Sequence, residues 1–159
     1  RVVFHDGLDA AARADMALAG LFGGLALANA GLGAAHGFAA PIGGMFAAPH
    51  GAVCAALLPR VMAMNLRALR RSSANSTGLA RYDEIARILT GDSGAQADDG
   101  VQWVSALVAE LGIPQLGYYG LNPSHVNDLV GKAAQSSSMK ANPVTLATEE
   151  LTDILQTAL

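Results

Sequence analysis

Aromatic side chains, charged side chains and cysteine are all scarce in this sequence. Aromatic residues make up 5% of the chain, so a folded core has to consist mainly of alanine, leucine, valine, methionine and glycine. Alanine and leucine favour helices, and small side chains let helices approach one another closely. Cys54 is the only cysteine. This excludes an internal disulfide and favours a reducing, cytoplasmic setting.

The scarcity of charge excludes further classes of protein. Charged residues make up 14% of the sequence, and the formal net charge is −3. The densest basic run, residues 67–71, does not continue, so the sequence has no footprint for nucleic acid. The hydrophobic share of 52% is too high for a disordered chain. Residues 1–6 lack the apolar region and the cleavage site of a secretory signal.

A long uncharged stretch dominates the first third of the chain. Residues 16–59 contain no Asp, Glu, Lys or Arg, and this length exceeds the ~20 residues that span a bilayer. The stretch also contains histidines and prolines, and its apolar content is largely alanine. We therefore interpret it as central helices that other helices cover on all sides. The alternative is a membrane hairpin. The pairs Gly23-Gly24 and Gly43-Gly44 are interpreted as packing glycines.

The spacing of the apolar residues predicts an all-α fold. The first helix opens with charged residues and turns apolar, so its beginning is expected to be exposed and its end buried. Pro41 is expected to limit the second helix. No β-alternation, repeat or linker is present, and residues 72–77 form a polar loop. The predicted helices span residues 9–32, 34–40, 50–71, 78–89, 98–111 and 122–134, and a last helix is capped at Thr148.

No glycine-rich nucleotide-binding loop is visible. Neither a G-x-G-x-x-G pattern nor a run of glycines follows a predicted strand, which is the arrangement that cradles a dinucleotide. The residues at hand therefore predict no cofactor-binding site of that kind within this chain.

Two histidines stand out in the most apolar part of the sequence. His36 and His50 are fourteen residues apart, and each is followed by glycine. A neutral imidazole is a good ligand for divalent iron or zinc, and two ligands from consecutive helices converge where those helices pack. The spacing alone also fits two core histidines bonded to backbone carbonyls.

The residues around these histidines resemble a known family signature. The matching segments are GLGxxH at 31–36, the Gly43-Gly44 pair, PHG at 49–51 and LLP at 57–59, with ARxxM at 12–16, ANA at 28–30 and NP at 142–143. Together they resemble the iron-containing (group III) alcohol dehydrogenase family over nearly the whole chain.

The resemblance implies a dehydroquinate synthase-like architecture. In that family an N-terminal α/β domain binds NAD(P), and a helical C-terminal domain holds the metal in the cleft between the two. Residues 1–159 are then the helical metal-binding domain, a multi-helix bundle, and the nucleotide-binding domain is absent from this chain. His36 and His50 match two of the metal ligands. The implied cofactors are Fe²⁺ or Zn²⁺ and NAD(P).

The sequence departs from the family pattern in two ways. The other two ligands, an Asp and a His, are expected upstream of Arg1, and His5 and Asp6 are not accepted as replacements. Metal binding by this chain alone is therefore expected to be weak or absent. Many members also carry a histidine four residues after the first ligand, where this sequence has Ala40.

The implied reaction of the intact enzyme is hydride transfer between a nicotinamide and an alcohol or aldehyde carbon, with the metal as Lewis acid. The chain alone is expected to be inactive, and its partner is the N-terminal domain, with a possible second copy of the chain. The alternatives are a free-standing helical module without catalysis and part of a maleylacetate reductase-type enzyme. The expected substrate-pocket residues are Phe38, Ala40, Met45 and Phe46.

Three other residues receive structural interpretations. Cys54 lies one helical turn beyond His50, a spacing that would let it approach the site, and it is interpreted as a small buried core thiol. Trp103 belongs to an amphipathic helix and is interpreted as core, and His125 is expected to be solvated.

Overall fold

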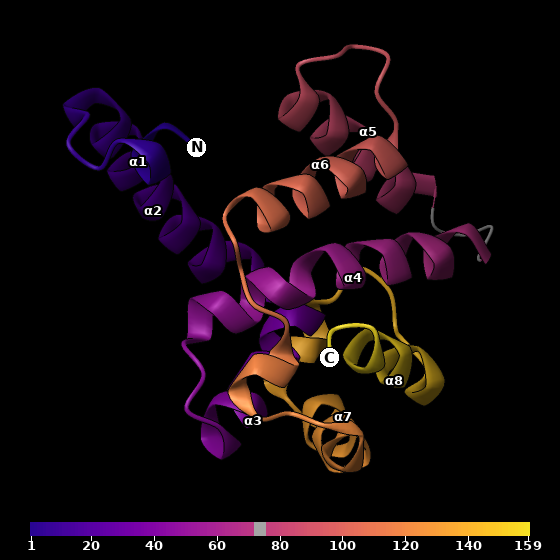
Figure 1. Cartoon of the computed structure of the whole chain (residues 1–159). Coiled ribbons are helices and arrows are strands. Elements are labelled where there is room, and N and C mark those ends of the chain that lie inside the picture. The colour runs from indigo at the N-terminus through magenta and orange to yellow at the C-terminus, as the bar shows by residue number, and fades with distance from the viewer. Residues whose placement is uncertain (72–75) are drawn as a thin grey trace.

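The computed structural model describes residues 1–71 and 76–159 and confirms an all-α fold, with no strand among these residues (Figure 1). The polar loop predicted at 72–77 lies mostly outside the described residues. The α-helices are α1 (Val2–His5), α2 (Ala10–Ala30), α3 (Ala34–Met45), α4 (His50–Arg71), α5 (Ser76–Thr90), α6 (Ala97–Glu110), α7 (Val126–Ala134) and α8 (Thr148–Gln156). The short 3₁₀ helices are η2 (Leu116–Tyr119), η3 (Pro123–His125) and η4 (Ser137–Ala141).

Helix α4 is the centre of the fold. It packs against α3, α5, α6 and α8, and Figure 1 shows it crossing the molecule between the α5–α6 pair and the other helices. Its apolar residues recur every three or four positions, as one face of a helix requires. Many of them are buried, including Val53, Leu57, Leu66 and Leu69. A helix that is contacted on several sides needs few charges, which explains the uncharged first half of α4.

The main hydrophobic core lies between α3, α4, α7 and α8. Side chains spaced three or four residues apart on α7 and α8 face this core, which is how amphipathic helices bury one side. The largest fully buried side chains of the core are Phe38, Ile42, Leu57, Leu116, Leu129, Ile154 and Leu155.

Helix α3 is longer than the sequence predicts. Pro41 was expected to limit it, but α3 continues through Pro41 to Met45. A proline inside a helix costs roughly 3 kcal/mol because it removes a backbone hydrogen bond. Ile42 follows it directly and is fully buried in the core. Burial of this large side chain favours continuing the helix despite the proline.

Helix α2 corrects the expectation of a buried end. None of its residues is buried, and it projects from the rest of the molecule (Figure 1). Leu21, Phe22 and Leu25 are 60%, 59% and 52% exposed. The apolar composition of α2 therefore cannot be explained by contacts among the described residues.

The two helices that could form a membrane hairpin, α2 and α4, differ in how much of them is buried inside the fold. Both α2 and α4 are long and apolar enough to cross a bilayer by length and composition. In α4, 61% of the most apolar window is buried inside the fold, whereas none of the corresponding window of α2 is buried. Helix α4 is therefore a core helix of the fold. A membrane hairpin that begins with α2 would then have no second membrane-spanning helix.

Close packing in this fold uses other glycines than the expected pairs. A Cβ at Gly23, Gly24, Gly43 or Gly44 would meet no atom within 4 Å, so these are not packing glycines within the described residues. Gly33 and Gly37 take that role. Cβ atoms there would lie 3.0 Å from Asn142 Oδ1 and 2.8 Å from Met139 Cε. The absence of these side chains lets the segment that contains η4 approach the start of α3.

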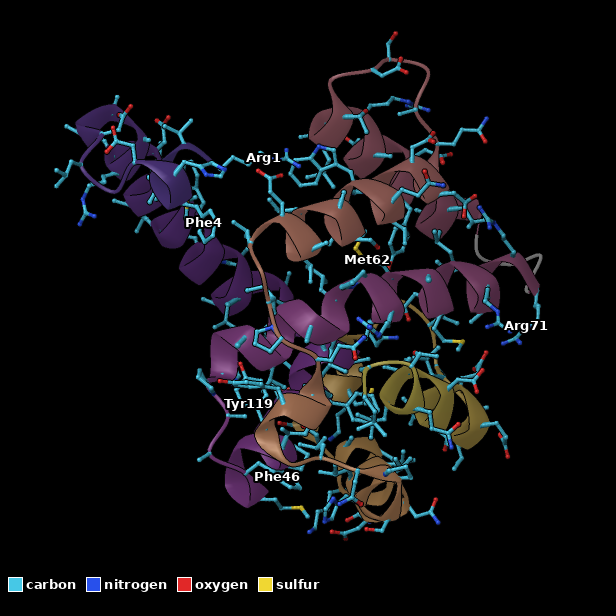
Figure 2. All side chains as sticks on the ribbon, in the orientation of Figure 1. Arg1, Phe4, Phe46, Met62, Arg71 and Tyr119 are labelled. Carbon is cyan, nitrogen blue, oxygen red and sulfur yellow. The ribbon has the colours of Figure 1, made fainter. Side chains whose placement is uncertain are left out.

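Arg1 connects the projecting arm to α6. Its guanidinium donates to the Glu110 carboxylate at 2.6 Å and lies 4.8 Å from the centre of the Trp103 ring (Figure 2). Trp103 was expected to be core, but it is only half-buried, and its ring faces this cation on the surface.

A pair of asparagines, the buried Asn65 and the partly buried Asn142, joins the start of α3 to α4. Asn142 Oδ1 accepts hydrogen bonds from the Ala34 backbone N–H at 3.1 Å and from Asn65 Nδ2 at 3.3 Å. Asn142 Nδ2 donates to Asn65 Oδ1 and to the Val144 carbonyl, both at 2.8 Å. Asn65 is 2% exposed, and its Nδ2 also donates to the Tyr82 hydroxyl at 3.1 Å. The network caps α3, whose first backbone N–H groups have no partner within the helix.

Removing the Asn142 amide should destabilise the protein. We expect Asn142→Ala to lower the free energy of unfolding by about 2–4 kcal/mol, because it leaves buried groups of Ala34 and Asn65 without partners. Chemical denaturation followed by circular dichroism measures this. The matched control is Asn127→Ala on the exposed side of α7, which should change stability by less than about 0.5 kcal/mol. Equal effects of the two substitutions would contradict the role of the network.

The start of α8 is held by Glu150 rather than by Thr148. The cap position is Ala147, one residue before the expected one, and its backbone N–H donates to Glu150 Oε2 at 2.8 Å. Glu150 is 8% exposed and also pairs with Arg71 at the end of α4. Burial raises the pKa of the Glu150 carboxyl, but the Ala147 N–H and Arg71 outweigh this effect and leave the pKa below its usual value.

The lowered pKa of Glu150 predicts a pH-dependent contribution to stability. A carboxyl whose pKa is lower in the folded state stabilises the protein above its unfolded pKa, and this contribution is lost as the pH falls through the folded pKa. We therefore expect Glu150→Gln to reduce stability by about 1 kcal/mol at neutral pH and to differ less from wild type in acid. Denaturation at several pH values tests this, with the exposed Glu149→Gln as the control. A difference that is independent of pH would contradict it.

Candidate metal centre

The two histidines of the sequence motif face each other across α3 and α4. His36 lies in the first turn of α3 and His50 is the first residue of α4. Their ring centres are 5.3 Å apart, with the planes tilted by 51°. The structure thus brings together the two residues that the sequence singled out.

The length of the connection explains this meeting. From His36 to Met45 the helix rises about 13.5 Å, at ~1.5 Å per residue. The connector between Met45 and His50 can span up to about 17 Å when extended. The chain can therefore return along α3, and α4 begins beside the first turn of α3.

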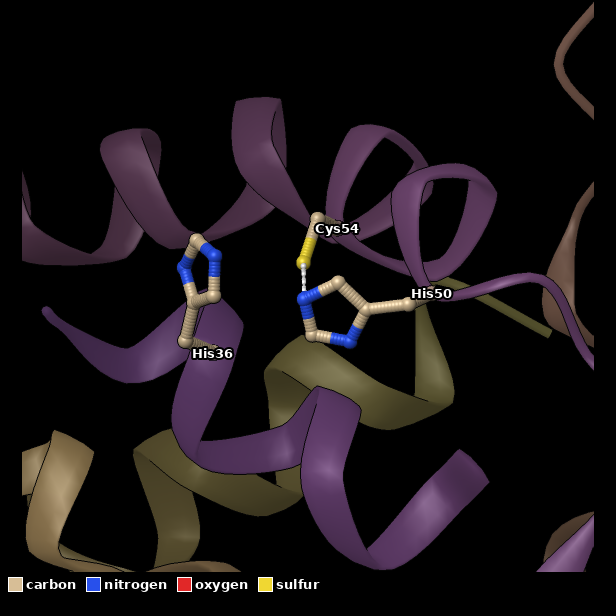
Figure 3. Close-up of side chains that lie close together, drawn as sticks. All are labelled: His36, His50 and Cys54. Carbon is tan, nitrogen blue, oxygen red and sulfur yellow. Dashed lines mark hydrogen bonds between the residues drawn. The ribbon is translucent and has the colours of Figure 1, made fainter. Parts of the chain in front are cut away.

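A third donor lies at the same place. Cys54 follows His50 by one turn of α4, and its Sγ lies 3.5 Å from His50 Nε2 (Figure 3). One donor atom from each of His36, His50 and Cys54 lies within 4.8 Å of the others. Figure 3 shows the three side chains turned toward a shared space between the two helices.

Cys54 is not the buried core thiol that the sequence suggested. The residue packs against the edge of the core but remains partly accessible. The spacing of one helical turn between His50 and Cys54 is already visible in the sequence. Residues at i and i+4 share a helix face, so the pattern His-x-x-x-Cys already indicated that the thiol and the imidazole meet.

The electrostatic setting favours uncharged donors. Partial burial lowers the pKa of the His36 imidazole, and the neighbouring His50 lowers it further. Burial also raises the pKa of the Cys54 thiol. Only a neutral imidazole has a free lone pair, so the His36 environment preserves its capacity as a ligand.

The expected pocket residues take separate positions. Phe38 is fully buried in the core, so it packs there rather than forming a wall that a substrate can reach. Ala40 lies one turn after His36 and is exposed. Met45 is exposed, and its Sδ accepts a hydrogen bond from Lys132 Nζ at 3.3 Å. Phe46 is half-buried.

Phe46 also explains the position of His125. The two rings meet edge to face, with their centres 5.0 Å apart, so His125 is half-buried rather than solvated. His125 Nδ1 accepts a hydrogen bond from the Asn122 backbone N–H at 3.2 Å. This imidazole has a local structural role at the start of η3.

A cleft of about 540 Å³ lies elsewhere in the molecule. It is formed between α4, α6 and the residues after α6, and none of His36, His50 and Cys54 lines it. Chemistry at the two histidines therefore does not use this cleft.

The fold and the facing histidines define the class of protein: an all-α domain that places two imidazoles close together where α3 meets α4. Comparison with known proteins gives the family. The family model for "Fe-containing alcohol dehydrogenase family, C-terminal" matches residues 1–159. The chain belongs to the iron-containing alcohol dehydrogenase family and corresponds to its helical C-terminal domain, as the motifs predicted.

Individual relatives agree with this assignment. The chain is 33% identical to the probable alcohol dehydrogenase EutG of Escherichia coli, covering 96% of this chain and 36% of that protein. It is 33% identical to the lactaldehyde reductase of the same organism, covering 91% of this chain and 37% of that protein. A variant of an archaeal halo-thermophilic alcohol dehydrogenase from a Red Sea brine pool superimposes with a TM-score of 0.87 at 25% identity, covering 99% of this chain and 40% of that one. The chain thus spans less than half the length of these relatives.

Proposed function

We propose that this chain is the metal-binding half of an NAD(P)-dependent oxidoreductase that interconverts an alcohol and an aldehyde or ketone. The observation that carries the proposal is the approach of His36 and His50 at the junction of α3 and α4. The family assignment supports an alcohol oxidoreductase. The donor set fits the metal, because neutral imidazoles bind divalent iron and zinc.

In this proposal the chain supplies metal ligands and one side of the reaction site. A bound Fe²⁺ or Zn²⁺ would act as a Lewis acid toward the oxygen of the alcohol or carbonyl. His36 and His50 would hold the ion, and the α3–α4 packing would fix the distance between them. The exposed Ala40, one turn beyond His36, would leave room beside the ion for substrate.

The nicotinamide would be held by another domain. The chain spans 36% of EutG and 40% of the archaeal alcohol dehydrogenase, and no nucleotide-binding loop occurs in its sequence. The exposed apolar side chains of α2 support a neighbouring structural unit, because surfaces of this kind are normally covered. We propose that an N-terminal nucleotide-binding domain occupies this side and completes the metal shell.

The ligand assignment is tested in the enzyme that contains both domains. We expect His36→Ala and His50→Ala each to lower metal content and to reduce turnover by at least about 100-fold, since even residues that only support a metal ligand contribute 10–100-fold. The measurements are metal analysis and steady-state kinetics. The matched control is His125→Ala, whose imidazole packs on Phe46 away from the pair. Unchanged metal content and turnover in the His36 and His50 variants would refute the proposal.

A second candidate function is a free-standing helical module that assembles through α2. The observation that favours it is the exposed apolar surface of α2 itself. This candidate predicts that the chain forms oligomers, which light scattering measures, and that Phe22→Asp returns it to a monomer. A wild-type chain that is monomeric at every concentration tested would exclude it.

A further inference from the structure

Arg60 differs from the other arginines of α4 in the partners of its guanidinium. It is half-buried, and its Nε and Nη1 donate to the backbone carbonyls of Thr157 and Ala56 at 2.6 and 2.7 Å. Both acceptors are neutral. The three arginines that follow on α4 each pair with a carboxylate, whereas no carboxylate of the described residues pairs with Arg60.

This guanidinium keeps both charge and donors for a further partner. Burial lowers the pKa of Arg60, because it disfavours the charged form. A guanidinium has more N–H donors than the two that the carbonyls use, and within residues 1–71 and 76–159 Nη2 donates to no acceptor. A partly desolvated cation is stabilised by an anion, and a carboxylate matches the planar arrangement of these donors.

The cleft of about 540 Å³ between α4 and α6 is lined by this arginine. Among the described residues that line it, Arg60 is the only charged one, and most of the others are apolar. Val101, Ser105 and Val108 form one wall, because their spacing places them on one face of α6. This wall is roughly 10 Å long, at ~1.5 Å of rise per residue. The volume falls in the range of small-molecule sites, about 300–1,000 Å³.

We propose that this cleft binds an aliphatic monocarboxylate of short to medium chain length. Its carboxylate pairs with Arg60, and its alkyl chain lies along α6 and displaces water from Val101, Val108 and Ile113. The single cation and the apolar walls together select this class over neutral hydrocarbons and over anions without an apolar part. The cleft is separate from His36 and His50, so the proposal does not depend on a metal.

Isothermal titration calorimetry of the full chain with hexanoate tests the role of Arg60. We expect Arg60→Gln to weaken binding at least about tenfold, because it removes hydrogen bonds to a charged group. Arg60→Lys should weaken binding less, since an ammonium keeps the charge but loses the planar donors. The matched control is Arg81→Gln, an exposed arginine on α5, which should bind hexanoate as the wild type does. Circular dichroism verifies that each variant keeps its helices.

A second pair of variants tests the cleft without changing Arg60 or its contacts with Thr157 and Ala56. Ser105 is exposed and lines the cleft, so Ser105→Phe places a ring in the space that the alkyl chain needs and should prevent binding. Gln102→Phe adds the same ring to the same helix at an exposed position outside the cleft, and it should bind hexanoate normally.

The ligand can be varied as well as the protein. Each further CH₂ that becomes buried should raise the affinity by about fourfold, so pentanoate should bind more tightly than butanoate, and hexanoate more tightly than pentanoate. Hexanol has the same chain length as hexanoate but no charge, and it should bind at least about tenfold more weakly.

Three results would overturn the proposal. Hexanoate binding that is unchanged in both Arg60→Gln and Ser105→Phe would assign the ligand to another apolar surface, such as that of α2. Hexanol that binds as tightly as hexanoate would contradict recognition of the carboxylate. A wild-type chain that binds none of these carboxylates would exclude the site. All three leave the proposed metal ligands untouched, because His36 and His50 do not line the cleft.

Discussion

The docking of the first turn of α3 is the constraint on which the rest of the site depends. The Asn142 amide caps this turn and is itself held by the buried Asn65 of α4. Gly33 and Gly37 allow the segment around η4 to approach closely enough for these hydrogen bonds to form. His36 lies in the same turn, so Asn142, more than a hundred residues further along the chain, helps to set its position. The asparagine-proline pair at 142–143 and the glycines at 31–37, which the sequence showed as separate motifs, are parts of one contact.

The metal centre follows from this contact and from the path of the chain after α3. The connector returns the chain to the start of α3, where His50 and Cys54 present their donors from adjacent turns of α4. Partial burial and the neighbouring imidazole lower the pKa of His36 and so favour its neutral form. The same geometry places Cys54, which the family signature does not specify, beside the two histidines.

Helix α2 shows the opposite situation, in which apolar residues have no partner within the described chain. Its most apolar window is nearly as hydrophobic as that of α4, yet none of its residues is buried. The sequence pattern cannot distinguish a helix that is buried, such as α4, from an apolar helix that is exposed, such as α2, because the two have a similar apolar composition. In the proposed enzyme, this surface and the nucleotide-binding domain belong to the same interface.

The sequence by itself determined the helices, the family and the two histidines. Helical periodicity and capping are local, so α4 begins and ends where residues 50–71 predicted, and the motif around His36 and His50 singled out two histidines that the fold brings together. Tertiary structure decided what depends on contacts between distant segments. Burial of Ile42 carried α3 through Pro41, the lack of a neighbour left α2 exposed, and the return of the chain brought Cys54 to the histidines. These outcomes depend on which surfaces pack against each other. The free energy of such tertiary contacts cannot be read from any short stretch of residues.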